Sequence, residues 1–256
     1  MEREISTEWV DVIVNDEKET SVMPAYLARP ATLGMYPNVL LGFELFGVTS
    51  YVRGVAERIA HLGYNALAPD FYHRLGRHIE LTDDAEGRTR GFELLAGIHR
   101  DGVLRDVQAA ITHLKTQAGS SDRTALLGLS LGGHIAYYVA TQVPLAALIV
   151  CYPGWLTSPD IPLSQPEPTL ALTSRIAEFG TRVLFLVGDQ DQLLTAEQRD
   201  QIARHLHETG VRHEMVVYPD TPHGFLCQER DSYRPTAADD AWSRMTALLA
   251  DALGSA

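Results

Sequence analysis

The sequence is poor in cysteine, with two among 256 residues. So few thiols cannot form the disulfide framework that holds many small secreted proteins together. Cys151 lies in the apolar run "LAALIVCYP", which indicates a buried core thiol. Cys227 follows "HGFL" and is interpreted as a packed loop residue, with a place near a functional site as the alternative. Because 45% of the residues are apolar, a large core can stabilise the chain instead.

Long hydrophobic runs are also missing. No stretch reaches the roughly 20 apolar residues that a membrane-spanning helix needs. The first ten residues, "MEREISTEWV", are charged and contain no apolar region of the kind found in signal peptides. We therefore expect a cytoplasmic protein that has no membrane as a partner.

The chain also has fewer basic than acidic side chains. The chain has 21 Lys and Arg against 33 Asp and Glu, which gives a formal net charge of −12 at pH 7. Because phosphate groups are bound by basic surfaces, this balance argues against nucleic acid and anionic membranes as partners. A small-molecule partner is compatible with it, and the oligomeric state is left undetermined.

Patterns for metals and nucleotide cofactors are absent from the sequence as well. His205 and His207 stand two residues apart on an expected helix, so they face different sides and make a poor metal-binding pair. Neither a phosphate-binding loop nor a dinucleotide fingerprint occurs. We expect a protein that needs no metal and no cofactor.

Apolar runs of strand length alternate with amphipathic segments of helical spacing along the chain. The expected strands cover residues 9–14, 21–30, 38–47, 64–71, 124–130, 145–153, 182–190 and 213–220, and the expected helices cover 52–63, 101–117, 134–143, 196–210 and 237–253. This alternation predicts an α/β fold with a mostly parallel central sheet and helices on both faces, in a single domain over residues 1–256. The proline-rich segment 158–168 is interpreted as a surface excursion.

Ser130 lies in "GLSLGG", between an expected strand and an expected helix. The stretch matches the pattern G-x-S-x-G, in which a sharp turn lifts the serine hydroxyl above the sheet and glycines permit close backbone approach. The alternative is a serine in a glycine-rich connection. The strand before it and the helix after it favour a nucleophile.

Two further polar signals follow later strands, and in parallel sheets ligand sites lie at the carboxyl ends of strands. Asp189 and Asp191 follow one strand, and either could orient an imidazole or serve as a turn or helix-capping residue. His223 follows the last strand. The chain order Ser, Asp, His is that of the α/β-hydrolase architecture.

Together, "FELFGV", "LAPDFY", "GLSLGG", "GDQD" and "HGF" resemble the motifs of the dienelactone hydrolase family of α/β-hydrolases, from about residue 20 to the C-terminus. The resemblance implies an α/β-hydrolase fold and a catalytic triad. Its histidine matches His223, and its aspartate matches Asp191, three residues after Gly188, rather than Asp189.

The same resemblance implies roles for residues around the nucleophile. Glu44 matches a glutamate that contacts the resting nucleophile, and the backbone N–H groups of Leu45 and Leu131 would form the oxyanion hole. A carboxylate inside the apolar run "LLGFELFG" also needs a reason to be there. Pocket positions fall on Phe46, Arg88 and Tyr152, with core packing the alternative for the two aromatic residues and a solvated side chain for Arg88.

Two positions depart from the family pattern. The family's nucleophile is commonly cysteine, whereas this chain has Ser130, a much weaker acid that needs His223 as a base in concert with attack. An arginine that binds the substrate's carboxylate is expected four residues after the histidine, where this chain has Cys227. We therefore expect substrate charge to matter less than the family name suggests.

These features predict a serine-dependent hydrolase that cleaves a small-molecule ester or lactone through an acyl-enzyme intermediate. A thioesterase or acyltransferase with the same triad is one alternative. A non-catalytic ligand-binding member of the fold is another, and the presence of Ser130, Asp191 and His223 argues against it.

Overall fold

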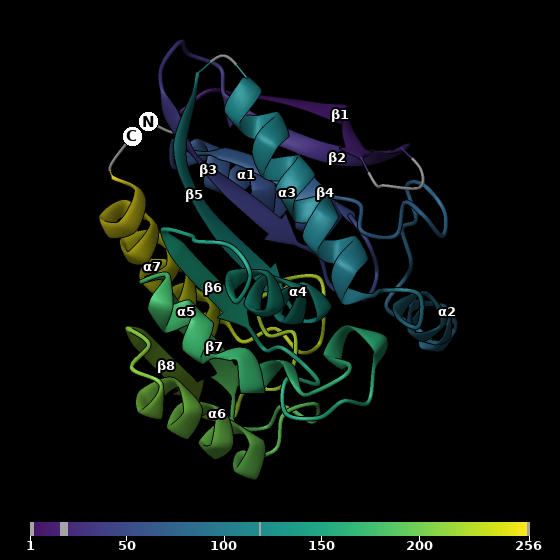
Figure 1. Ribbon diagram of the computed structural model, residues 1–256, viewed down its shortest axis with the longest axis vertical. Coiled ribbons are helices and arrows are strands. Elements are labelled where there is room, and N and C mark those ends of the chain that lie inside the picture. The colour runs from purple at the N-terminus through teal and green to yellow at the C-terminus, as the bar shows by residue number, and fades with distance from the viewer. Residues whose placement is uncertain (1–2, 16–19, 118, 255–256) are drawn as a thin grey trace.

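A computed structural model describes residues 3–15, 20–117 and 119–254. Its centre is an eight-stranded sheet with strand order β1-β2-β4-β3-β5-β6-β7-β8 (Figure 1). The strands are β1 Ile5–Asn15, β2 Thr20–Pro30, β3 Tyr36–Gly42, β4 Asn65–Pro69, β5 Ser120–Leu129, β6 Ala147–Cys151, β7 Arg182–Gly188 and β8 His213–Tyr218. β2 pairs antiparallel with both β1 and β4, and all other pairs are parallel, so the prediction of a mostly parallel sheet is confirmed.

Helices cover both faces of the sheet. They are α1 Ser50–His61, α2 Ala85–Leu95, α3 Arg100–Thr116, α4 Leu131–Ala140, α5 Ser174–Glu178, α6 Ala196–Glu208 and α7 Pro235–Leu253, with short 3₁₀ turns η1 Pro162–Ser164 and η2 Thr169–Leu172. α3 and α4 pack on one face and α1 and α7 on the other (Figure 1). Within the described residues no helix is long and apolar enough to cross a bilayer.

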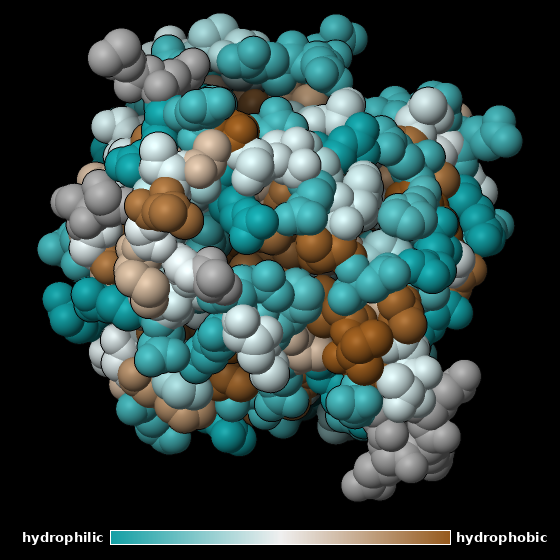
Figure 2. All heavy atoms as spheres, turned by 90° about the horizontal axis from the view of Figure 1, so that it is seen from above, coloured by the Kyte–Doolittle hydropathy of each residue, from teal (hydrophilic) through white to brown (hydrophobic). Residues whose placement is uncertain are grey.

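Burial explains the uniform apolar runs of the central strands. Every residue of β3, β4 and β6 is buried, as expected for parallel strands with helices on both sides. The edge strand β1 instead exposes most of its residues. Seen from above, the surface is largely hydrophilic, with hydrophobic residues in separate patches (Figure 2).

The strand expected at 38–47 is shorter than predicted. β3 ends at Gly42, and residues 43–47 form a buried turn. Apart from Glu44, its residues are apolar because they are buried in this turn, not because they extend the sheet. Gly47 has a φ of +85°, which suits a turn rather than a strand.

Two other segments also differ from expectation. The helix α2 was not predicted, because only Gly87, Gly91, Leu94 and Leu95 are buried on it and they make a weak apolar stripe. Its N-cap is Asp84, whose side chain accepts the Gly87 N–H at 2.8 Å. The segment 158–168 is only partly a surface excursion, since it contains η1 and buries Ile161, Leu163 and Ser164.

Candidate active site

Ser130 stands at the tight turn between β5 and α4. Its φ of 53° and ψ of −113° lie in a region that L-residues rarely adopt. Two backbone hydrogen bonds hold the turn: the Ser130 N–H donates to Cys151 O at 3.0 Å, and the Gly132 N–H donates to Phe43 O at 2.8 Å. The strain is therefore supported by the neighbouring strand β6 and the buried turn after β3.

Glycines are required here because three backbone segments meet. A Cβ atom on Gly132 would lie 2.1 Å from the carbonyl carbon of Gly42, and one on Gly128 would lie 2.1 Å from the carbonyl oxygen of Gly132. Real Cβ atoms do not approach backbone this closely. The pattern around Ser130 is thus a steric requirement of the turn.

We expect Gly132→Ala to lower the free energy of unfolding by about 3 kcal/mol, because the new methyl group overlaps backbone that cannot move cheaply. Urea unfolding followed by circular dichroism measures it. Gly54→Ala in α1 is the matched control, since a Cβ atom added there would have no neighbour within 4 Å. The control should gain up to about 1 kcal/mol from helix propensity. Equal stability of the two variants would contradict the close approach.

Three side chains from three strand ends form a hydrogen-bonded chain. Ser130 Oγ lies 2.9 Å from His223 Nε2, and His223 Nδ1 lies 2.9 Å from Asp191 Oδ2. These residues follow β5, β8 and β7. The Asp191 side chain is fully buried, whereas His223 keeps 15% of its side chain exposed. The imidazole therefore bridges a buried carboxylate and a hydroxyl that opens to the pocket.

Of the two candidate aspartates, the structure brings Asp191 to the histidine. Its second oxygen, Oδ1, accepts the Leu193 N–H at 2.8 Å, which fixes the carboxylate plane. Asp189 is exposed and accepts the Thr221 N–H at 3.3 Å. Asp189 thus stabilises the turn that leads to His223 without contacting the imidazole.

The Leu131 N–H points from the first residue of α4, where helix N–H groups have no intrahelical acceptor. In the described part of the chain, Gly132, Gly133 and His134 have backbone acceptors at this helix start, and Leu131 has none. Leu131 and Leu45 both line the pocket into which Ser130 opens. Both residues therefore lie at the same cavity as the Ser130 hydroxyl.

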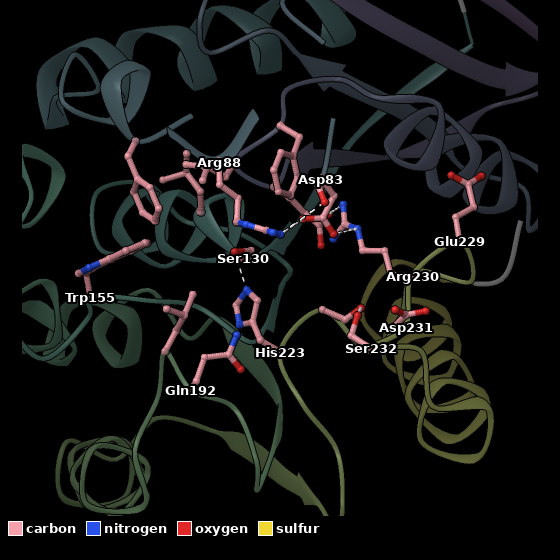
Figure 3. Close-up of a pocket in the computed structure, with 17 residues that line it drawn as sticks. Asp83, Arg88, Ser130, Trp155, Gln192, His223, Glu229, Arg230, Asp231 and Ser232 are labelled. Atoms are coloured by element: carbon pink, nitrogen blue, oxygen red, sulfur yellow. Dashed lines mark hydrogen bonds and ion pairs between the residues drawn. The ribbon is translucent and has the colours of Figure 1, made fainter. Parts of the chain in front are cut away.

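The pocket has a volume of about 560 Å³, enough for a small organic molecule. Its walls come from the turn after β3, from α2 and the loop before it, from the loops after β6 and β7, and from the segment after His223 (Figure 3). The predicted residues that line it are Glu44, Leu45, Phe46, Arg88, Ser130, Leu131 and His223. Tyr152 does not line it: it is fully buried and packs edge-on against the His223 ring, with centroids 5.0 Å apart.

Charged side chains form a cluster at one side of this pocket. Arg230 Nη2 makes an ion pair of 2.6 Å with Glu44 Oε2, and Arg230 Nε lies 3.0 Å from Asp83 Oδ2. Arg88 Nη1 lies 2.6 Å from the other oxygen of Asp83. Burial by itself would lower the pKa of Arg230, but the Glu44 carboxylate outweighs it and raises that pKa above its ordinary value. Arg230 is therefore a fixed cation.

The buried position of Glu44 is explained by this partner. The residue is 2% exposed, and besides Arg230 it accepts a hydrogen bond of 3.4 Å from the Tyr152 hydroxyl. A carboxylate in an apolar run is tolerable when a cation pairs with it. Glu44 lines the same pocket as Ser130, which is compatible with the position expected for it.

Aromatic side chains form another part of the pocket lining. Phe92 of α2 and Trp155 meet edge-on with ring centroids 6.3 Å apart, and Phe46 lies under the Arg230 guanidinium at 5.0 Å. The loop that carries Trp155 is held by His134, whose Nδ1 lies 2.9 Å from Gly154 O. The pocket thus combines apolar faces with paired charges.

Neither cysteine lines the pocket. Cys151 and Cys227 are both buried, and burial raises the pKa of both thiols. A buried neutral thiol is a poor nucleophile. Within the described residues, no group of three or more His, Cys, Asp or Glu side chains could hold a metal ion.

Sequence reasoning missed several pocket residues: Asp83, Phe92, Trp155, Gln192 and Arg230. Cys227 does occupy the fourth position after His223, but Arg230, three residues further along, enters the pocket instead. An acidic residue as deeply embedded as Glu44 was the available signal that a cation had to lie nearby.

Comparisons with known proteins extend over the whole of this site. Residues 23–253 match the family described as "Dienelactone hydrolase family". A Synechocystis protein provisionally named carboxymethylenebutenolidase is 33% identical over 225 residues, which cover 88% of this chain and 89% of that protein. A Bradyrhizobium protein provisionally named 2-oxo-3-(5-oxofuran-2-ylidene)propanoate lactonase is 29% identical over 246 residues, covering 96% and 94%.

Among solved structures, a provisionally named dienelactone hydrolase from Klebsiella pneumoniae superposes with a TM-score of 0.83. It is 28% identical in sequence, and the superposition covers 96% of this chain and 99% of that chain. The arrangement of strands and helices is therefore also found in a crystal structure.

Proposed function

The chain belongs to the dienelactone hydrolase family, and on that premise we propose that it hydrolyses a small-molecule ester or lactone through an acyl-enzyme formed on Ser130. The observation that carries the proposal is a continuous chain of hydrogen bonds. It runs from Ser130, which lines the pocket, through His223 to the buried Asp191. We also propose that residues 1–256 form one domain, which the single sheet supports.

In the first half of the reaction, Ser130 Oγ attacks the carbonyl carbon while His223 Nε2 takes the hydroxyl proton. Asp191 holds the Nδ1–H tautomer and stabilises the imidazolium. The N–H groups of Leu131 and Leu45 donate to the developing oxyanion. The intermediate then expels the alcohol oxygen, which takes the proton from His223. In a lactone this alcohol stays attached through the acyl chain.

In the second half, a water molecule gives one proton to His223 Nε2 and its oxygen attacks the acyl carbon. The carbon–oxygen bond to Ser130 breaks, and Ser130 Oγ recovers the proton from His223. The products are a carboxylic acid and the free enzyme. Since an imidazole activates the water, the route uses no metal and no cofactor.

The names of the two relatives support the substrate class. Both denote unsaturated lactones, and both include a carboxyl group as well. For this chain we propose the ester or lactone carbonyl as the shared feature. Comparing kcat/KM for aryl esters with kcat/KM for lactones would distinguish an acyclic substrate from a cyclic one.

A fluorophosphonate probe should label the protein once, on Ser130, because only an activated serine attacks phosphorus rapidly. Intact-mass and peptide mass spectrometry measure the label. Ser130→Ala should abolish labelling. Ser232→Ala is the matched control, since Ser232 lines the same pocket but donates to Gly224 O, and it should still be labelled.

Labelled protein should also lose the ability to hydrolyse p-nitrophenyl butyrate and small lactones. Labelling without any hydrolysis, together with turnover of thioesters, would instead indicate a thioesterase. Absence of both labelling and hydrolysis would contradict the proposed function and favour a ligand-binding role.

A further inference from the structure

A carboxylate of the protein itself lies between the two pocket arginines. Asp83 Oδ1 is 2.6 Å from Arg88 Nη1, and Asp83 Oδ2 is 3.0 Å from Arg230 Nε (Figure 3). Each oxygen thus has its own guanidinium partner. The hydrogen bond from Arg88 is charge-assisted, and such bonds are stronger than those between neutral groups.

Asp83 thereby pairs with both pocket arginines, the groups to which the carboxylate of a substrate could bind. Glu44 pairs with a second nitrogen of Arg230, so the two arginines are matched by two carboxylates. Glu229 and Asp231 add further negative charge to the pocket lining. An incoming anion therefore meets no unpaired cation among these side chains and several like charges.

Because Asp83 belongs to the same chain as the two arginines, it competes strongly with a free anion for them. Asp83 lies in the loop directly before α2, whose first turn also carries Arg88. A carboxylate attached to the same chain has a high effective concentration at the guanidinium groups. A free substrate would have to displace it and leave the Asp83 carboxylate unpaired. Because Asp83 is one-third exposed, removing its charge should alter the pocket without disturbing the core.

We propose that Asp83 is a specificity-determining residue: by occupying the Arg88–Arg230 pair it makes the pocket select neutral esters or lactones over carboxylate-bearing ones. This proposal rests on the proposed hydrolase function. It predicts that neutralising Asp83 uncovers an anion-binding site that the chain already contains.

Two esters with the same leaving group and acyl chain test the proposal. They are p-nitrophenyl methyl adipate, which is neutral, and mono-p-nitrophenyl adipate, which is an anion at pH 7. For the wild type we expect kcat/KM to be at least tenfold higher for the neutral ester. In Asp83→Asn the ratio of anionic to neutral kcat/KM should rise by about tenfold or more, as expected for one new charged hydrogen bond.

Asp231→Asn is the matched control, since it removes the same charge from the same pocket but not from the arginine bridge. It should change the ratio by less than threefold. The gain in Asp83→Asn should also shrink as salt is raised, because it is electrostatic. An unchanged ratio in Asp83→Asn, an equal change in Asp231→Asn, or a wild type that prefers the anion would each overturn the proposal.

A binding measurement separates this proposal from the proposed catalysis. Adipate should bind Asp83→Asn at least tenfold more tightly than it binds the wild type, as measured by isothermal titration calorimetry. If neither ester is hydrolysed but this difference is found, the hydrolase function fails, whereas the occupation of the two arginines by Asp83 is supported. Equal binding by both proteins overturns the role of Asp83 whether or not hydrolysis occurs.

Discussion

Ser130→Ala and His223→Ala should each lower kcat for a p-nitrophenyl ester by about 10⁵- to 10⁶-fold, and the double variant should be hardly slower than either. The effects should not add because, in the proposed mechanism, Ser130 attacks only when His223 takes its proton across their 2.9 Å hydrogen bond. The residual rate reflects binding and the oxyanion donors, which neither substitution removes. Steady-state kinetics at high enzyme concentration measure the loss.

The controls for these variants are a serine and a histidine outside the pocket. Ser243→Ala in α7 and His207→Ala in α6 replace exposed side chains and should retain wild-type kcat. Thermal unfolding of each variant checks that the fold survives. Near-normal turnover in either Ser130→Ala or His223→Ala would show that the hydrogen-bonded chain is not the catalytic device.

Asp191→Asn should lower kcat by about 10⁴-fold, although the side chain keeps its shape. In the wild type, Oδ1 of Asp191 accepts the Leu193 N–H and Oδ2 faces His223 Nδ1. The asparagine oxygen should stay with the Leu193 N–H, which turns the amide NH₂ toward Nδ1. The histidine must then carry its proton on Nε2, so it cannot accept one from Ser130.

Asp189→Asn is the matched control for this change. Its side chain accepts the Thr221 N–H through Oδ1, and the asparagine oxygen can do the same. We expect less than a fivefold effect on kcat. A large loss in Asp189→Asn with little loss in Asp191→Asn would reverse the roles of the two aspartates.

Much of the fold could be predicted because burial on both faces imposes an uninterrupted apolar sequence on central strands. The expected strands over β4, β6 and β7 overlap the observed ones for this reason. The strand expected over residues 38–47 was too long for the same reason. The apolar residues after Gly42 are buried in a turn rather than in the sheet. Hydrophobicity reports burial, and it cannot distinguish a paired strand from a packed turn. Helix α2, with few buried residues, gave too little signal.

The positions of Ser130, Asp191 and His223 could be predicted because each follows a strand end and the topology brings those ends together. The charged cluster could not. Asp83 and Arg230 lie in irregular segments more than a hundred residues apart, and their contact depends on loop paths rather than on periodicity. Counting from His223 placed the expected arginine at Cys227, because a loop can deliver the same charge from a different position.

The contacts among Gly42, Gly128 and Gly132 fix the backbone of residue 130 without using its side chain. The glycines thus set the backbone conformation of this turn, whereas the proposed reactivity belongs to the side chain of residue 130. In the proposed mechanism, a serine-to-cysteine substitution at position 130 would change the attacking atom and leave the glycine contacts in place. In the proposed mechanism, the side chain at position 130 supplies the reactivity, and the three glycines supply only the shape of the turn.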